Sequence, residues 1–487
     1  MKRVFTAPTN DPATDLSEHA GPLPPTLAEL VARAGHLRWC HWKSNVRLDL
    51  SISGKTDLDL LVHPEDAAAF HATLSELGFV PFHAMRWGDY PGVSNWLGAD
   101  PETGILFHIH LHDHLLTGMK SAKEQELPWT DLVLDARIPD LKMTVPIIPR
   151  ALEVHILLAR EVAKSSRPWR IYRRLRGKQP ISGMERDEMA FLLSEAAHLE
   201  VDRWGNRLWG ESAWQRARTN LAEDVWGTSR GLRAICNALK PVLRQWRRPL
   251  FPAMLQRTYG VLLKRIIRLR KRIDPTTATG MRFMTRAPMI AFVGSDGAGK
   301  STLTSDLRNW LGWKADCQLV YFGSKGPLYI VVKRWLGRWR PIIAATKRGS
   351  SSPSVSVGGR GSLWRAFRVV CAAHFRLRTL RRAERMMARG QIVIADRFPQ
   401  FEVFGIHDGP SGIDPNQFRG FQCLLYRLEE KINARLRCAK PDLVVRLLVP
   451  VDVALRRKPN HDRDSIERKV EINQTLSFDG ATNCRSG

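Results

Sequence analysis

The sequence lacks the features of a disulfide-rich, secreted or membrane-spanning protein. Its seven cysteines are far apart and none forms a C-x-x-C pair, which argues against a disulfide framework and a cysteine-based zinc site. It has no apolar run of the roughly 18 residues that a membrane-spanning helix needs. Its first residues also lack the apolar core of a signal peptide. From these absences we expect a cytoplasmic protein.

Acidic residues are scarce relative to basic ones. The 487-residue chain has 75 Lys and Arg against 48 Asp and Glu, a net charge of +27. The balance is about −6 for residues 1–150, about +15 for 151–272 and about +18 for 273–487. A basic surface either attracts polyphosphates, nucleic acid or anionic lipid, or is a solvated face that binds no partner. No nucleic-acid reader motif is present, so we expect no specific nucleic-acid partner, while contact with an anionic membrane stays open.

The spacing of apolar residues divides the chain into five segments. Residues 1–25 are rich in Pro, Thr and Asp and predict a flexible lead, 26–149 alternate short helices and strands, 150–272 have helical spacing, and 273–287 form a linker. Residues 288–487 alternate strands with helices, which predicts a parallel sheet. The expected strands of this last segment are 289–293, 318–322, 391–395 and 442–449, and its expected mobile loop is 348–362.

A phosphate-binding loop follows the first of these strands. The pattern G-x-x-x-x-G-K-[ST] is matched at every fixed position. Glycines let successive backbone N–H groups converge on one anion, and the following helix points its positive N-terminus at the phosphates. Lys300 can reach the β- and γ-phosphates, and the Ser301 hydroxyl can ligate Mg²⁺. The chain is therefore predicted to bind ATP and Mg²⁺ through Gly294, Ser295, Asp296, Gly297, Ala298, Gly299, Lys300, Ser301 and Thr302.

Two later segments supply further candidate residues. A buried strand ends in Asp396 and Arg397, which places both side chains at the carboxyl edge of the sheet. Asp396 can hold Mg²⁺, and Arg397 offers a planar fork to a phosphate. The strand at 442–449 leads into a basic helix whose cations either close over the transferring phosphoryl group or form a solvated surface. Arg456, Arg457 and Lys458 lie on this helix, and Arg463 follows it. Arg457 joins Lys300 and Arg397 as a candidate catalytic residue.

The segments GSDGAGKST, strand–Asp-Arg-Phe and PDL…VALRRK together resemble the thymidylate kinase family of P-loop kinases, over residues 285–487. The resemblance implies that Asp296 meets a hydroxyl of the acceptor, that Asp396 and Arg397 contact its phosphate, and that the basic helix is a lid. Two acceptor motifs of the family are replaced, by YFGSKGPLY (321–329) and PQFEVFGIHDGPSG (399–412). The chain is more similar to the thymidylate kinase-like proteins encoded with bacterial surface-polysaccharide genes, which leaves the acceptor open.

Residues 40–62 resemble the polymerase-beta-type nucleotidyltransferases. Asp57 and Asp59 alternate on one expected strand, so both carboxylates share a face and can hold a metal ion. Ser44 lies where that superfamily has a Gly-Ser turn. The third carboxylate of the superfamily is absent, because the later strand carries histidines on that face. These histidines either bind zinc or another transition metal or form mutual hydrogen bonds: His108, His110 and His112.

The apolar and basic residues of 251–273 are spaced as in an amphipathic helix. Such a helix either lies on a membrane surface or packs its apolar stripe on a neighbouring element, and we expect the packing. A homodimer stays open as an assembly.

Together these features predict an α/β protein. It would have a C-terminal P-loop NTPase parallel sheet with flanking helices, a helical middle, and a smaller N-terminal nucleotidyltransferase-like α/β domain. The predicted function is an ATP- and Mg²⁺-dependent phosphotransferase, resembling thymidylate kinase, that phosphorylates a nucleotide or related small molecule. The alternative is a nucleotide-binding regulatory or scaffold protein in polysaccharide or envelope biosynthesis, without kinase turnover.

Overall fold

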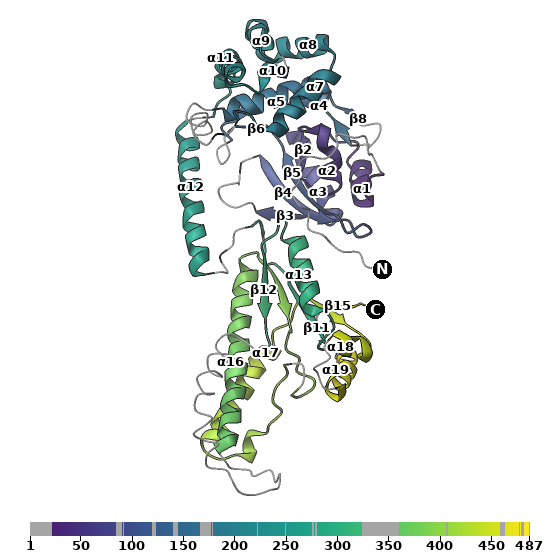
Figure 1. Cartoon of the computed structure of the whole chain (residues 1–487), viewed down its shortest axis with the longest axis vertical. Coiled ribbons are helices and arrows are strands. Elements are labelled where there is room, and N and C mark those ends of the chain that lie inside the picture. Colours follow the sequence, from purple (N-terminus) through teal and green to yellow (C-terminus); the bar gives the residue numbers. More distant parts are fainter. Residues whose placement is uncertain are drawn as a thin grey trace. The chain divides into compact units, whose positions relative to one another are not determined.

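The computed structural model describes residues 22–83, 90, 92–118, 123–139, 145–165, 177, 179–221, 223–248, 250–274, 277, 280–323, 360–405, 408–457, 463–476, 478 and 482–486. The expected flexible lead (1–25) and mobile loop (348–362) lie almost entirely outside these residues. The chain divides into two compact units, one up to Met284 and one from Thr285 onward (Figure 1).

The N-terminal unit contains a mixed sheet of eight strands in the order β10-β3-β4-β5-β2-β1-β9-β8. Strands β2 and β5 run parallel, although β4 and β5 beside them are antiparallel. The core on this sheet includes Trp39, Phe70 and Phe107. The strands are β1 (Trp39–His41), β2 (Leu58–Val62), β3 (Val80–His83), β4 (Val93–Ala99), β5 (Leu106–His112), β8 (Ile138–Pro139), β9 (Pro146–Ile147) and β10 (Arg282–Phe283). Strand β10 lies within the expected linker and pairs with β3.

Short helices and a hairpin complete this part of the unit. They are α1 (Pro25–Arg33), α2 (Leu48–Ile52), α3 (Ala67–Glu76), α4 (Thr130–Asp135) and the hairpin of β6 (Leu115–Thr117) with β7 (Gln125–Leu127). The expected strand of Asp57 and Asp59 corresponds to β2, which begins one residue after Asp57, and the later strand with the histidines corresponds to β5, its parallel neighbour.

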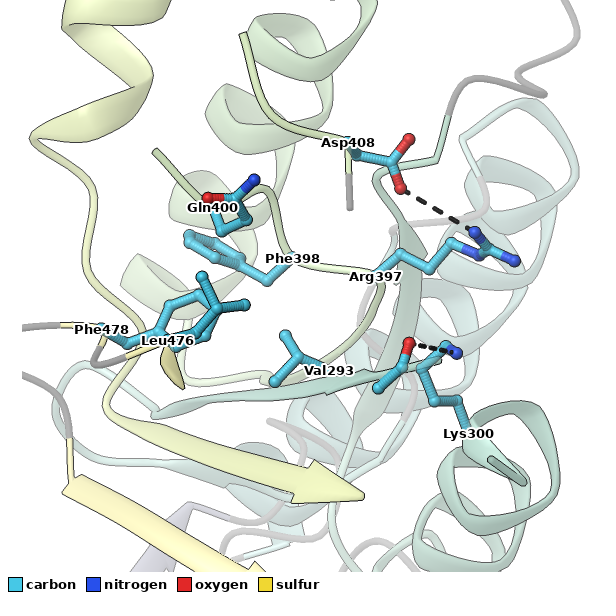
Figure 2. Close-up of a pocket in the computed structure, with 9 residues that line it drawn as sticks. Val293, Lys300, Arg397, Phe398, Gln400, Asp408, Leu476 and Phe478 are labelled. Atoms are coloured by element: carbon cyan, nitrogen blue, oxygen red, sulfur yellow. Dashed lines mark hydrogen bonds and ion pairs between the residues drawn. The ribbon is translucent and has the colours of Figure 1, made fainter. Parts of the chain in front are cut away.

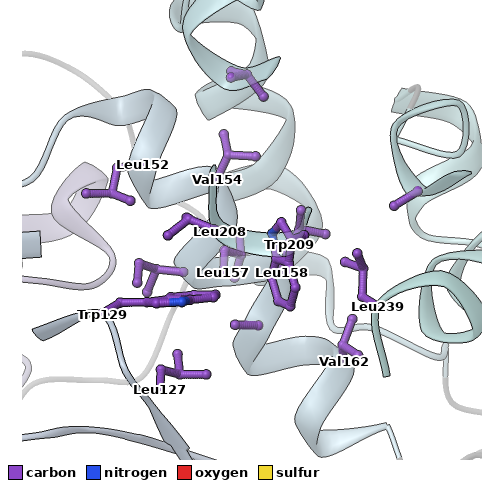
Figure 3. Packing of buried hydrophobic residues seen from close by; sticks show 14 of the residues in the cluster. Leu127, Trp129, Leu152, Val154, Leu157, Leu158, Val162, Leu208, Trp209 and Leu239 are labelled. Carbon is purple, nitrogen blue, oxygen red and sulfur yellow. The ribbon is translucent and has the colours of Figure 1, made fainter. Parts of the chain in front are cut away.

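The rest of the N-terminal unit is helical, and its core forms around one helix. Helix α5 (Arg150–Lys164) has 11 of its 15 residues buried, which marks it as a core helix rather than a surface one. Trp129 and Trp209 pack edge to face beside it, with ring centroids 5.1 Å apart (Figure 3). The helices around it are α7 (Gly183–Glu195), α8 (His198–Trp209), α9 (Glu211–Arg218), α10 (Glu223–Trp226) and α11 (Ser229–Gln245).

Helix α12 (Leu250–Ile273) differs from these helices because its apolar stripe is exposed. Leu262, Ile266, Leu269 and Ile273 follow the i, i+4, i+7, i+11 spacing of one helix face, and the exposed fraction is 59% for Leu269 and 81% for Ile273. The expectation that this stripe packs on a neighbour is therefore wrong for the described residues. Within the part of the chain that the structure describes, no helix combines the length and apolarity needed to cross a bilayer.

The C-terminal unit is built on a five-stranded sheet in which every pairing is parallel. Its order is β12-β13-β11-β14-β15. The four predicted strands are confirmed as β11 (Met289–Gly294), β12 (Cys317–Tyr321), β13 (Ile392–Asp396) and β14 (Leu443–Leu447). Strand β15 (Thr482–Ser486) was not predicted, because its residues, TNCRS, form no apolar run.

Helices flank this sheet, and its strand order determines where a ligand binds. The helices are α13 (Lys300–Leu311), α16 (Arg360–Ala388), α17 (Phe421–Arg437), α18 (Val451–Arg457) and α19 (Arg463–Thr475). Strand β11 is central, and its sequence successor β12 lies two positions away, beyond β13. The chain thus changes direction across the sheet at β11. In parallel sheets, ligands bind in the crevice at the carboxyl ends of strands at such a point.

Candidate functional site

The loop between β11 and α13 has the backbone that a phosphate cradle requires. Gly297 and Gly299 have positive φ angles of 87° and 91°, which glycine adopts without steric cost. A Cβ on Gly297 would lie 2.8 Å from the backbone oxygen of Ala454, so α18 approaches the loop too closely for any larger residue. Helix α13 begins at Lys300 and directs its first N–H groups at this loop.

Lys300 is buried and its ammonium group lies over the loop. Its Nζ donates hydrogen bonds to the backbone oxygens of Gly294, at 2.8 Å, and Ser295, at 2.7 Å. Burial and the nearby Arg397 guanidinium lower the pKa of Lys300 to about 8. The cation is thus held at the centre of the loop, where it can move onto a phosphate oxygen. Thr302, in the first turn of α13, is exposed.

The Ser301 hydroxyl and the Asp396 carboxylate lie together. Asp396 ends β13 and pairs in register with Phe292 of β11, which places it beside the start of the loop. Ser301 Oγ donates a hydrogen bond to Asp396 Oδ2 at 3.2 Å. The other carboxylate oxygen, Oδ1, is buried and has no hydrogen-bond partner among the described residues. A hydroxyl beside a carboxylate with an unused oxygen is a donor set that fits Mg²⁺.

Asp296, inside the loop, is held by two cations. Its Oδ1 accepts a hydrogen bond from Arg397 at 2.7 Å, and its Oδ2 accepts one from Lys469 of α19 at 2.7 Å. Burial alone would raise the pKa of Asp296, but Lys469, Arg397 and Lys300 together hold it well below its usual value. The carboxylate is therefore charged and immobilised across the physiological pH range.

Arg397 adopts an unusual backbone conformation at the centre of the site. Its φ is +65°, a left-handed value that is uncommon for residues other than glycine and is often found at functional positions. Its guanidinium also lies 4.0 Å from Asp408 Oδ2 and over the ring of Tyr321. Figure 2 shows Arg397 and Lys300 on the same side of a pocket whose lining also includes Phe398, Gln400, Asp408 and Phe478.

The basic helix α18 contributes one arginine to the loop. Arg457 Nη1 donates a hydrogen bond to the backbone oxygen of Gly297 at 3.2 Å. Arg463 instead pairs with Glu467 and Asp452, all three side chains being largely exposed. Lys458 lies outside the described residues. Of the arginines predicted to form a lid, only Arg457 is seen at the loop within the described part of the chain.

Three residues of this site were not predicted from the sequence: Tyr321, Asp408 and Lys469. Lys469 belongs to no motif, and Tyr321 and Asp408 were noted only within segments that depart from the family pattern. Lys469 lies 173 positions from its partner Asp296, so no local signal could have joined them.

The predicted residues of the N-terminal unit also lie together, on one face of β2 and β5. His108 Nδ1 lies 2.7 Å from Asp57 Oδ1, and His110 Nδ1 lies 3.4 Å from Asp59 Oδ1. Lys43 Nζ lies 2.6 Å from Asp59 Oδ1. In the described part of the chain, His108 and His110 contact these carboxylates, and the alternative of hydrogen bonds among the histidines is not seen. Ser44 has a φ of +55°, in keeping with a tight turn, although the nucleotidyltransferase resemblance stays a prediction.

Sequence comparison identifies relatives for part of the chain. No protein-family model matches it. "Uncharacterized ATP-binding protein YghR" of Escherichia coli (strain K12) is 32% identical over 215 residues, which are 43% of this chain and 82% of that protein. "Uncharacterized ATP-binding protein YghS" of the same strain is 29% identical over 217 residues, 40% of this chain and 84% of that protein.

Comparison with solved structures finds a thymidylate kinase from Ehrlichia chaffeensis. The alignment covers 41% of this chain and 92% of that one, at 16% identity and a TM-score of 0.19. A score this low does not show a shared fold, so family membership rests on the sequence comparison. At 32% identity over most of that relative's length, the chain belongs to the family of YghR.

Proposed function

We propose that this protein is an ATP- and Mg²⁺-dependent phosphotransferase whose site is the loop 294–301 with the end of β13. The observation that carries the proposal is the 3.2 Å contact between Ser301 Oγ and Asp396 Oδ2, at the carboxyl edge of a parallel sheet and beside a glycine-rich loop. The names of two relatives, which describe ATP-binding proteins, support the nucleotide part of this proposal.

The loop would bind the triphosphate tail of ATP. Backbone N–H groups from Gly297 to Ser301 would surround the β-phosphate, because the positive φ angles of Gly297 and Gly299 turn successive amides toward one point. Lys300 would exchange its two carbonyl partners for phosphate oxygens. Arg457, already at the loop, would stabilise charge on the phosphoryl group as it transfers.

Ser301 and Asp396 would hold Mg²⁺. When bound there, the ion neutralises charge on the β- and γ-phosphate oxygens. The contribution of the protein is to keep the hydroxyl and the carboxylate at a fixed separation on two rigid elements, α13 and β13. The unused Asp396 Oδ1 is the oxygen that this arrangement leaves available.

Arg397 would position the acceptor, which we propose to be a nucleotide or a related small phosphate compound. An acceptor oxygen would form a bond to the γ-phosphorus as the bond from that phosphorus to the bridging oxygen of ADP breaks. If the acceptor oxygen belongs to a phosphate, it is already charged and no base is needed. Asp296 accepts a hydrogen bond from Nη2 of the Arg397 guanidinium and so fixes its orientation. The remaining N–H groups of the guanidinium would then donate to the acceptor phosphate.

The test is phosphoryl transfer from labelled ATP to a panel of nucleoside monophosphates, nucleosides and sugar phosphates. We expect transfer to one class of acceptor, and a loss of about hundredfold or more in Lys300→Ala, as for other groups that stabilise transition-state charge. Lys431→Ala, which removes an exposed lysine of α17, is the matched control. A folded Lys300→Ala protein with unchanged transfer would refute the proposal.

Helix α12 favours a second candidate function, a nucleotide-binding scaffold at an anionic membrane. Its exposed apolar stripe lies on a helix that has no acidic residue and carries Arg270, Lys271 and Arg272 in its last turn. An apolar face flanked by cations suits the boundary between anionic headgroups and acyl chains.

Vesicle sedimentation tests this second function. We expect binding to vesicles containing phosphatidylglycerol that weakens with salt, and little binding to pure phosphatidylcholine. Leu269→Glu should abolish it, whereas Leu199→Glu, the same change at an exposed leucine of α8, should not. Equal binding by both variants would exclude α12 as the contact.

A further inference from the structure

The carboxylates and histidines of the N-terminal unit lie apart in the sequence from the proposed kinase site, and one group of three is arranged like a set of metal ligands. Asp59 of β2 pairs in register with His110 of the parallel strand β5. His112 lies two residues further along β5 and therefore on the same face. The ligand atoms of these three side chains all lie within 4.8 Å of one another.

His112 provides an independent indication of a ligand. Its side chain is 2% exposed, and neither ring nitrogen has a hydrogen-bond partner in the described part of the chain. A buried polar group without a partner destabilises the folded state, because it has lost its hydrogen bonds to water. The ring packs edge-on against Trp42, with centroids 5.1 Å apart, and its Nε2 lies 3.9 Å from Asp59 Oδ1. The unused nitrogen thus faces the carboxylate.

The spacing of the ligand atoms matches a small coordination sphere. Bond lengths of about 2.0–2.1 Å in tetrahedral geometry give ligand–ligand separations of about 3.3 Å. The Asp59 Oδ1 atom lies 3.4 Å from His110 Nδ1 and 3.9 Å from His112 Nε2. Small side-chain rotations would therefore be enough to bring the three ligand atoms to the separations of a tetrahedral metal site. His110 is one-third exposed, so an ion can enter from its side.

We propose that Asp59, His110 and His112 bind a divalent transition-metal ion of the zinc type. Two imidazoles and one carboxylate favour such an ion over Mg²⁺ or Ca²⁺, which prefer oxygen ligands. Lys43, whose Nζ lies 2.6 Å from Asp59 Oδ1, neutralises the carboxylate and competes with the ion. The lysine moves aside when the metal binds.

A neighbouring group, Asp57 with His108 and His110, is the weaker candidate. Both nitrogens of His108 already have partners, Asp57 at 2.7 Å and Asn95 at 3.2 Å. Metal binding there would break existing hydrogen bonds, whereas binding at His112 would give a partner to Nε2, which has none among the described residues.

The experiment is a titration of the full-length, chelator-treated protein with Zn²⁺ against a chromophoric competitor, and separately with Co²⁺ followed by its d–d absorption. We expect one tight site per chain. His112→Gln should weaken it at least about tenfold, since even changes beyond the ligands cost that much. Lys43→Met should tighten it by removing the competing cation. His114→Gln, at an exposed histidine just beyond β5, is the control and should change affinity less than about twofold.

Several outcomes would overturn the assignment. Loss of the site in His108→Gln but not in His112→Gln would move it to the neighbouring group. Equal zinc affinity of the wild type and the His110→Gln/His112→Gln protein would make His112 a structural histidine. His110→Gln, at a partly exposed position, tests the site if His112→Gln does not fold. Zinc binding that disappears in Lys300→Ala would place the ion at the kinase loop instead.

Discussion

At the scale of single residues, Lys300 connects the structure of the loop to its pH dependence. Its ammonium is buried against the backbone oxygens of the loop, and its pKa is lowered to about 8 by burial and by Arg397. The sequence predicted the position of this lysine from the glycine pattern alone, because every determinant lies within eight consecutive residues.

We therefore expect MgATP affinity to fall as the pH rises above about 8. The charged phosphates favour the protonated lysine, so binding raises its pKa and takes up a proton near pH 8. Calorimetry in buffers of different ionisation enthalpy would detect this uptake as a buffer-dependent heat. In Lys300→Arg, whose guanidinium stays charged, the uptake should vanish. The same proton uptake in that variant would assign it to another group.

Other residues of the site could not be predicted, for a physical reason. Asp296 was expected to meet the acceptor, but its carboxylate is shared between Arg397 and Lys469. Such contacts depend on which helix packs at the end of the sheet, and nothing in the local sequence around Lys469 distinguishes it from a surface lysine. The acceptor role of Asp296 stays a prediction.

At the scale of elements, helix α5 contains a buried acid whose titration affects folding. Glu153 is almost fully buried and accepts hydrogen bonds from Asn45 N at 2.6 Å and Asn45 Nδ2 at 3.1 Å. Burial and the nearby Glu188 raise its pKa from 4.5 to about 8, against the effect of these hydrogen bonds. The folded state therefore keeps a proton that the unfolded chain has lost between these two pH values.

The stabilisation linked to this proton is complete below about pH 4.5 and is lost as the pH rises through about 8. We expect Glu153→Gln, which imitates the neutral acid, to be more stable than the wild type at pH 8 and similar at pH 4.5. The difference should change by at most about 1.4 kcal/mol per pH unit. Urea unfolding at several pH values measures it, with the exposed Glu102→Gln as control. A parallel pH dependence in all three proteins would contradict this account.

The elements themselves were predictable where they carry an apolar signal. Four strands of the C-terminal sheet were located within one or two residues, since each is a short apolar run between breakers. Strand β15 has no such run, and β10 fell within a segment that resembled a linker. Both strands are defined by the neighbour to which they pair, which no local pattern reveals.

The two units of the chain have separate hydrophobic cores. The core of the C-terminal unit extends from Met289 to Val444, and the two larger clusters of the N-terminal unit lie between Leu27 and Leu243. The predicted fold class, a mixed α/β protein, is confirmed. The finer domain boundaries stay a prediction, because a charge or composition shift does not locate a packing boundary.

We expect MgATP to protect only residues 285–487 from amide hydrogen exchange. At a concentration of 100 times its Kd, a ligand stabilises the state that it binds by about 2.7 kcal/mol, or about a hundredfold in opening equilibrium. Amides of α5 in the other core should keep their exchange rates. Equal protection of both units would show that they unfold together, and none in either would contradict nucleotide binding.

The two bonds that Lys300 makes to the carbonyls of Gly294 and Ser295 have a consequence for selectivity. Before any anion arrives, the ammonium is already solvated by the protein itself. A small monovalent ion such as chloride would have to compensate for both lost contacts with a single charge. A polyphosphate replaces both contacts and accepts hydrogen bonds from the backbone amides at the same time. The loop therefore selects polyphosphates over small anions by their length and charge, without any contact to the base or the sugar.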